Sequence, residues 1–157
     1  MGDILKINWK KLFISVLIPV GLGFIVGIIS GSQNGYKEMI TPSFAPPGIL
    51  FPIVWTILYI LMGVSSYMIK MSGDLKSEDA LRTYYLQLAV NLLWSFIFFT
   101  FKLYLLSFLW IILLIGLVGL MILKFYNINR ISAYIQIPYL LWIIFAAILN
   151  FSIYLLN

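Results

Sequence analysis

The chain has 157 residues, which is typical of a single domain, and its amino acids are 63% hydrophobic and only 10% charged, with a mean hydropathy of +1.07. A soluble domain of this size leaves much of its surface exposed and cannot bury so many apolar side chains, so the composition predicts an all-α membrane protein. The chain has neither cysteine nor histidine, which excludes disulfides, the usual zinc sites and haem ligation by these residues. The formal net charge is +5.

A membrane-spanning helix needs about 20 mainly apolar residues. In chain order, the apolar runs predict a five-transmembrane-helix bundle in one domain over residues 1–157, with helices at about 12–29, 47–69, 83–101, 103–125 and 132–156. Pro19 and several glycines interrupt the first run, which favours a retained helix over a cleaved signal peptide.

The connections between these helices are predicted from their polarity and their breaks. The segment MSGDLKSEDALR, residues 71–82, is the most polar of the chain and is predicted to be a loop. Lys102 is the break between the third and fourth helices. Pro19 and Pro138 lie inside predicted helices and are expected to bend them, because proline removes a backbone donor.

The basic residues predict an orientation in the membrane. Most fall in the N-terminal tail and in the second and fourth connections, namely Lys6, Lys10, Lys11, Lys70, Lys76, Arg82, Lys124 and Arg130. The other side carries only Lys37 and Lys102. Since cytoplasmic loops are enriched in Lys and Arg, the N-terminus is predicted to be cytoplasmic. The basic residues are scattered over short loops, so no nucleic-acid partner is expected.

Charged side chains avoid the predicted spans. All five acidic residues lie in the tail or the loops, namely Asp3, Glu38, Asp74, Glu78 and Asp79. Ion-coupled transporters usually keep charges inside the membrane, so their absence from mid-span argues against that class. No pair of nucleophile and base is visible, and no metal site is expected.

Aromatic and amide side chains recur at helical spacing inside three spans. These stripes consist of Trp55 and Tyr59 in the second helix, Asn91, Trp94 and Phe98 in the third, and Trp142, Ala146 and Leu149 in the fifth. They indicate either core packing, with Asn91 and Asn150 bonding between helices, or one apolar pocket with few polar groups. Gly23, Gly27 and Gly31 recur every four residues, which permits close packing within the bundle or a homodimer contact.

Three motifs together resemble the translocator protein family, also called the tryptophan-rich sensory protein or peripheral benzodiazepine receptor family. They are PSFAPPGILFPIVWTILYILMGVSSY from Pro42, YLQLAVNLLWSFIFF from Tyr85 and IPYLLWIIFAAILN from Ile137. The resemblance implies a homodimer of five-helix bundles. It also implies a pocket near the first loop that binds porphyrins, such as protoporphyrin IX, and similar flat apolar ligands, with no cofactor required.

The resemblance assigns site residues to this sequence. Tyr36 and Pro46 match the lid, and the aromatic and amide stripes match the pocket, as Trp55, Tyr59, Asn91, Trp94, Phe98, Trp142, Ala146 and Leu149. Pro47 suits the first position of a helix, so PSFAPPG is expected to form a stiff lid segment that starts the second helix.

The chain also departs from the family pattern. Phe44 and Gly35 stand where the family often has tryptophan, and no basic residue follows Tyr154, so the sterol motif is incomplete. The short tail fits a bacterial cell-membrane protein. The favoured function is a sensor, carrier or regulator of tetrapyrroles. The alternatives are light-dependent porphyrin degradation that uses Trp55 and Trp142, and a structural or partner-binding bundle.

Overall fold

The computed structural model describes residues 6–157, and all regular secondary structure in that range is helical. The all-α prediction is therefore confirmed. In chain order the elements are α1 (Trp9–Ile29), α2 (Ser32–Gly35), the 3-10 turn η1 (Tyr36–Glu38), α3 (Leu50–Lys70), α4 (Ser77–Ser95), the π-helical turn η2 (Phe96–Thr100), α5 (Tyr104–Tyr126), α6 (Arg130–Ile135) and α7 (Ile137–Leu156).

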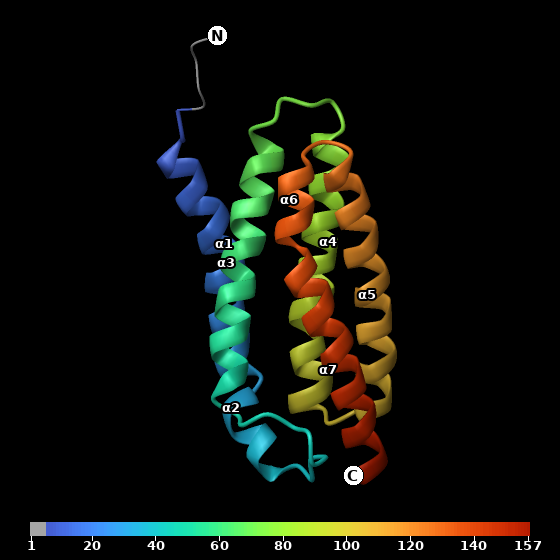
Figure 1. Ribbon diagram of the computed structural model, residues 1–157. Helices are drawn as coiled ribbons and strands as arrows, with labels where there is room; N and C mark the ends of the chain where they lie inside the picture. The colour runs from blue at the N-terminus through green and yellow to red at the C-terminus, as the bar shows by residue number, and fades with distance from the viewer. Residues whose placement is uncertain (1–5) are drawn as a thin grey trace.

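The long helices run side by side as an elongated bundle (Figure 1). α1 packs against α3, α4 packs against α5, and α5 packs against α7, while α3 also contacts α4 and α6. Four helical segments are long and apolar enough to cross a membrane: α1, α3, α5 and the segment 130–156 that joins α6 and α7. Apolar side chains cover their outer faces, as expected when lipid is the solvent.

The bundle sorts the connections onto two ends. The α3–α4 loop and the α5–α6 loop lie at the end where α1 begins, and the long α2–α3 connection lies at the end where the chain terminates (Figure 1). This arrangement matches the separation of the basic loops from the PSFAPPG loop that the sequence predicts. Which end faces the cytoplasm stays a prediction, and Asp3 lies outside the described residues.

The start of α4 corrects a sequence prediction. The predicted loop 71–82 ends at Lys76, and α4 begins at Ser77, six residues before the predicted start of the third helix. Glu78 and Asp79 lie in the first turn, where acidic groups favour the positive end of the helix dipole. Arg82 also lies 2.7 Å from Glu78, one turn away. The polar composition of residues 77–82 therefore led to a loop prediction for a segment that is helical.

The start of α3 corrects a second prediction. Pro47 is not the first residue of the helix, since α3 begins at Leu50. Instead, the Leu50 amide donates to the Pro47 carbonyl at 3.0 Å, which closes a turn ahead of the helix. The PSFAPPG segment is therefore entirely loop, and α3 starts two residues after it, with Pro52 in the first turn, where proline is tolerated.

The fifth predicted helix consists of two segments. α6 ends at Ile135, α7 begins at Ile137, and Pro138 lies in the first turn of α7. Since proline has no backbone N–H, it is tolerated in the first turn and breaks a helix that would continue through it. The bend expected at Pro138 is thus a break at Gln136. α1, by contrast, continues through Pro19 without interruption.

A tight turn at Lys102 separates the third and fourth predicted helices, as the sequence predicts. Before it, α4 ends at Ser95 and the chain continues as the π-helical turn η2. Lys102 has a φ of +54°, in the left-handed region.

Glycines allow α1 and α3 to approach closely. A Cβ atom on Gly63 of α3 would lie 2.6 Å from the Ser15 carbonyl oxygen in α1, and a Cβ on Gly23 would overlap the Tyr59 ring. Gly31 has a φ of +74° and follows the end of α1. Of the three glycines at four-residue spacing, Gly23 therefore serves packing within the bundle. The homodimer stays a prediction.

Candidate functional site

The two predicted lid residues lie together at the end of the bundle where the chain terminates. The Tyr36 hydroxyl donates to the Pro46 carbonyl oxygen at 2.8 Å. The Tyr36 ring packs edge-on against Phe51 in the first turn of α3, with centroids 4.8 Å apart. Partial burial raises the pKa of Tyr36 above its usual value, because the phenolate loses hydration. The hydroxyl is therefore a protonated donor at neutral pH.

The α1–α3 connection is also fastened to the rest of the bundle. The side-chain amide of Asn157 accepts from the Ile40 N–H at 3.2 Å and donates to the Ile40 carbonyl at 2.9 Å. The Thr100 hydroxyl donates to the Ser30 carbonyl at 3.0 Å. These bonds hold the connection across the ends of η2 and α7.

A chain of hydrogen bonds crosses the interior between α3, α4 and α7. The Tyr59 hydroxyl donates to Asn91 Oδ1, the Asn91 amide donates to the Tyr139 hydroxyl, and Tyr139 donates to Gln87 Oε1, each at 2.8 Å. Asn91, Tyr139 and Gln87 are buried. The interhelical bonding expected of Asn91 is confirmed, and it fixes three helices relative to one another.

Sequence reasoning missed two members of this chain. Neither helical spacing nor the family resemblance singles out Tyr139 or Gln87. A usable signal was present, because Gln87 lies four residues before Asn91 and therefore on the same face of α4. For Tyr139 the signal is weaker, since a tyrosine in a membrane helix is common at interfaces.

Three further predicted residues form a packed cluster nearer the chain's end. The Trp94 ring stacks on Phe98 with centroids 4.8 Å apart, and Leu149 packs in the same buried cluster. The Trp94 indole N–H donates to Asn150 Oδ1 at 3.1 Å, and the Asn150 amide donates to the Tyr104 carbonyl at 2.9 Å. Asn150 thus forms hydrogen bonds between helices, as expected. The cluster is packed interior and not an open cavity.

The two tryptophans of the degradation hypothesis lie in different surroundings. Trp55 packs against Tyr59 and Tyr139, with ring centroids 5.5 and 6.2 Å away. Trp142 contacts Phe51 and Phe145, with ring centroids 5.9 and 5.4 Å away. The indole N–H of Trp142 is buried and makes no hydrogen bond to the described residues. Ala146 is buried one turn after Trp142, within the core.

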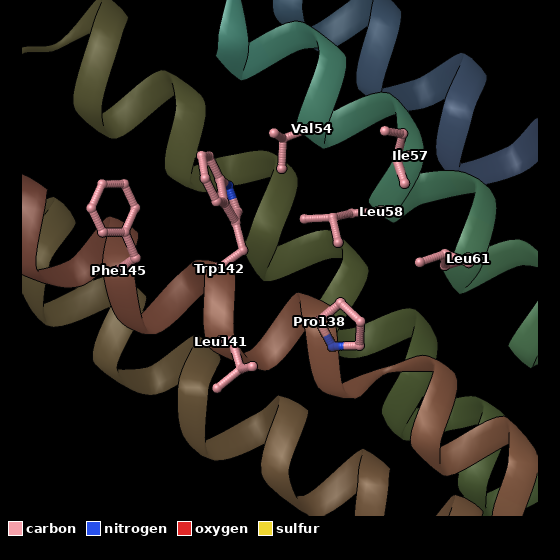
Figure 2. Close-up of a pocket in the computed structure, with 8 residues that line it drawn as sticks. All are labelled: Val54, Ile57, Leu58, Leu61, Pro138, Leu141, Trp142 and Phe145. Carbon is pink, nitrogen blue, oxygen red and sulfur yellow. The ribbon is translucent and has the colours of Figure 1, made fainter. Parts of the chain in front are cut away.

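A groove of about 450 Å³ opens beside Trp142, between α3 and α7 (Figure 2). Its side chains are all apolar: Val54, Ile57, Leu58 and Leu61 from α3, with Pro138, Leu141, Trp142 and Phe145 from α7. Figure 2 shows the Trp142 indole extending from α7 toward α3. The groove lies where α7 diverges from α3, since α6 contacts both α3 and α5, whereas α7 packs mainly against α5.

The ten predicted site residues therefore do not all line one open cavity. Of the ten, only Trp142 is among the residues that line the α3–α7 groove. The others belong to the lid contact, the polar chain or the packed clusters. Within the described part of the chain, no three His, Cys, Asp or Glu side chains come together as a metal site would need. The groove offers apolar contact and aromatic faces, which suits recognition of a flat apolar molecule.

Comparison with known proteins identifies the family. The model of the TspO/MBR family matches residues 15–156. The chain belongs to this family. A tryptophan-rich protein TspO from Archaeoglobus fulgidus is 37% identical over 96% of this chain and 99% of its own length. Protein CrtK from Rhodobacter capsulatus is 33% identical over 93% and 92% of the two chains. The translocator protein of Sus scrofa is 30% identical over 88% and 85%. Family membership and the apolar helices together identify an integral membrane protein of the TspO/MBR family.

Proposed function

We propose that this TspO/MBR family protein is a membrane receptor for flat apolar ligands of the porphyrin class, with protoporphyrin IX as the leading candidate. The observation that carries the proposal is the apolar α3–α7 groove with Trp142 in its wall. A tetrapyrrole has broad apolar faces and polar edge groups. In the groove, its faces pack against aromatic and aliphatic side chains. This function suits a sensor or carrier, a role consistent with the tryptophan-rich sensory protein name of a Cereibacter sphaeroides relative.

Trp142 is the residue with the clearest reason to contact the ligand. Its indole N–H is buried without a partner, and such a donor costs about 1–3 kcal/mol when it stays unsatisfied. If the indole turns so that its N–H faces the groove, a ligand carboxylate or carbonyl would accept this hydrogen bond. The indole face would at the same time stack on the macrocycle.

The other predicted residues act by positioning the groove walls. The Tyr59–Asn91–Tyr139 chain holds α3, α4 and α7 in a fixed arrangement. The Tyr36–Pro46 bond holds the lid segment beside Phe51, which contacts Trp142. A rigid, preorganised site loses less conformational entropy when it captures a ligand.

The proposal includes a fifth membrane span. α4 and η2 together cover residues 77–100, which is long enough to cross the ~30 Å hydrocarbon core. Their polar side chains Gln87 and Asn91 are buried and hydrogen-bonded, as a span inside a bundle requires. With five spans, the basic loops lie on the cytoplasmic side together with the N-terminus.

A groove-filling substitution tests this proposal. Leu141 lines the groove and is 62% exposed, whereas Leu155 lies on the same helix outside the groove and is 67% exposed. Detergent-solubilised wild type, Leu141→Trp and Leu155→Trp are titrated with protoporphyrin IX in dim light, and the shift of the Soret absorption band is followed. We expect saturable binding that Leu141→Trp weakens at least tenfold and Leu155→Trp leaves unchanged.

Two outcomes would count against the proposal. Unsaturable shifts of equal size in all three proteins mean that porphyrin partitions into the micelle. Equal saturable binding by both variants places the ligand elsewhere. Wild type and Trp142→Phe with bound porphyrin, kept under illumination or in darkness, test the degradation alternative. Loss of the Soret band that requires the wild-type protein and light, and that Trp142→Phe abolishes, would favour an enzyme-like role.

A further inference from the structure

A second groove lies at the end of the bundle where the chain terminates, away from Trp142. It has a volume of about 450 Å³, and it runs between the first turn of α5 and the last turn of α7. Leu103, Leu106 and Tyr154 are among the side chains that line it, and Lys102 and Asn157 stand at its polar end. Figure 1 shows the turn before α5 beside the C-terminal end of α7. The groove therefore joins an apolar surface along the helices to a cation at the end of the bundle.

The backbone at Lys102 is strained for a lysine. Its φ of +54° lies in the left-handed region, where a residue with a Cβ atom costs about 1–2 kcal/mol and glycine fits freely. The tight turn between η2 and α5 thus favours glycine at this position, and its geometry gives no reason for a lysine. Strained residues of this kind concentrate where a side chain has a function.

The Lys102 ammonium group is held only loosely by its protein partner. Its Nζ lies 3.6 Å from a Glu38 carboxylate oxygen, and the two side chains are 56% and 68% exposed. Exposed ion pairs of this kind contribute little, because solvent screens them. Another anion can therefore replace Glu38 beside Lys102 without a large penalty.

A cation above an apolar groove at the membrane boundary matches one class of molecule. The phosphate of an anionic phospholipid carries the complementary charge for Lys102, and an acyl chain is complementary to the Leu103 and Leu106 surface. Tyr154, at the same level, belongs to the residue types that favour the headgroup region. A zwitterionic lipid fills the apolar part equally well and lacks the net charge.

We propose that this groove is a binding site for an anionic phospholipid, whose phosphate pairs with Lys102 in competition with Glu38. Glu38 is the last residue of η1, in the α1–α3 connection that also contains Tyr36 and Pro46. Lipid binding in the groove therefore breaks the Lys102–Glu38 ion pair, which is one of the contacts between that connection and the rest of the bundle. The site is separate from the α3–α7 groove, so it does not depend on the proposed porphyrin site.

The test measures lipid selectivity in the purified full-length chain. Wild type, Lys102→Gln, Lys37→Gln and Glu38→Gln are placed in detergent with phosphatidylglycerol or phosphatidylcholine, and retained lipid is counted by native mass spectrometry. Lys37 is the matched control, because it lies at the same end of the bundle and does not line the groove. We expect Lys102→Gln to lower the preference for phosphatidylglycerol about fivefold, Lys37→Gln to leave it unchanged, and Glu38→Gln to raise it.

A second variant separates lipid binding from folding. Lys102→Gly removes the charge and relieves the left-handed strain, so it should lose the lipid preference while unfolding at the same or a higher temperature. The proposal is overturned if Lys102→Gln and Lys37→Gln reduce the preference equally, which would mean diffuse electrostatics. It is also overturned if Lys102→Gln has no effect, or if soluble glycerol phosphate competes as strongly as the lipid.

Discussion

Replacing Gly63 with alanine places a methyl group inside the contact between α1 and α3. The new Cβ would lie 2.6 Å from the Ser15 carbonyl oxygen and 2.9 Å from the Val16 amide nitrogen, and it would overlap the Val16 Cα. Non-bonded carbon atoms normally stay ~3.5–4.0 Å apart. All three obstructing atoms belong to the backbone of α1, so no side-chain rotation relieves the clash, and α1 must move as a unit.

The expected cost follows from two opposing effects. Overpacking of this kind costs about 1–3 kcal/mol. Exchange of glycine for alanine inside a helix returns about 0.5–1 kcal/mol, because glycine loses more backbone entropy on folding. We therefore expect Gly63→Ala to lower the free energy of unfolding by up to about 2.5 kcal/mol, and to lie about 1–3 kcal/mol below an alanine substitution at a helix glycine without a clash.

Gly116 and Gly119 in α5 are the matched controls. A Cβ atom at either position meets no atom within 4 Å, so alanine there should be neutral or stabilising. Unfolding is followed by tryptophan fluorescence as sodium dodecyl sulfate is added to protein in mild detergent. If Gly63→Ala unfolds at the same detergent fraction as Gly116→Ala, α1 does not pack on α3 as described.

Three further substitutions test the interior, the lid and a helix cap. Asn91→Leu should destabilise the protein by about 2–4 kcal/mol in the same unfolding assay, because the Tyr59 and Tyr139 hydroxyls each lose a partner in the interior. An unfolding midpoint unchanged from wild type would contradict the hydrogen-bond chain. Tyr36→Phe should cost about 1 kcal/mol at neutral pH. Burial raises the pKa of Tyr36 in the folded protein above its pKa in the unfolded chain. The stability that the protonated hydroxyl contributes is therefore complete below the unfolded-state pKa and is lost as the pH rises through the folded-state pKa. The free energy of unfolding of the wild type should therefore fall toward that of Tyr36→Phe at strongly alkaline pH. A difference between the two proteins that stays constant with pH would contradict this account. Asn129→Ala removes the side-chain cap of α6 and should cost about 1 kcal/mol, measured against Asn127→Ala as a control.

The apolar runs predicted the main helices well, because lipid exposure demands apolar side chains all along a span. α1, α3 and α5 start and end within three residues of the predicted bounds. α1 begins three residues early, at Trp9, because the Asn8 side chain caps it by accepting from the Lys11 amide. Local capping of this kind is visible in a sequence only when the cap is sought.

The failures have local physical causes. The start of α4 is polar and was predicted as loop, yet Glu78 and Arg82 stabilise a helix through the dipole and their ion pair. Pro47 fits a helix start, yet the turn that it closes delays α3 to Leu50. Pro138 was expected to bend the fifth helix, and the interruption lies two residues earlier, at Gln136, because the proline takes a place in the first turn of α7.

The sequence predicted which residues face the interior of the bundle, but it did not predict where a groove opens. Helical spacing placed Tyr59 and Asn91 on interior faces, and the two side chains are hydrogen-bonded to each other. Spacing along one helix carries no information on how far two helices separate. The α3–α7 groove, with Leu58 and Leu141 in its walls, therefore appears only once the bundle is assembled.

The central claim is that the ligand lies in the α3–α7 groove against Trp142. The most direct test is an experimental structure of the wild-type protein with protoporphyrin IX bound. The account predicts density for the macrocycle between α3 and α7, stacked on the Trp142 indole, with a polar edge group near its N–H. Density on another face of the bundle, with the groove filled by detergent or lipid, would contradict it.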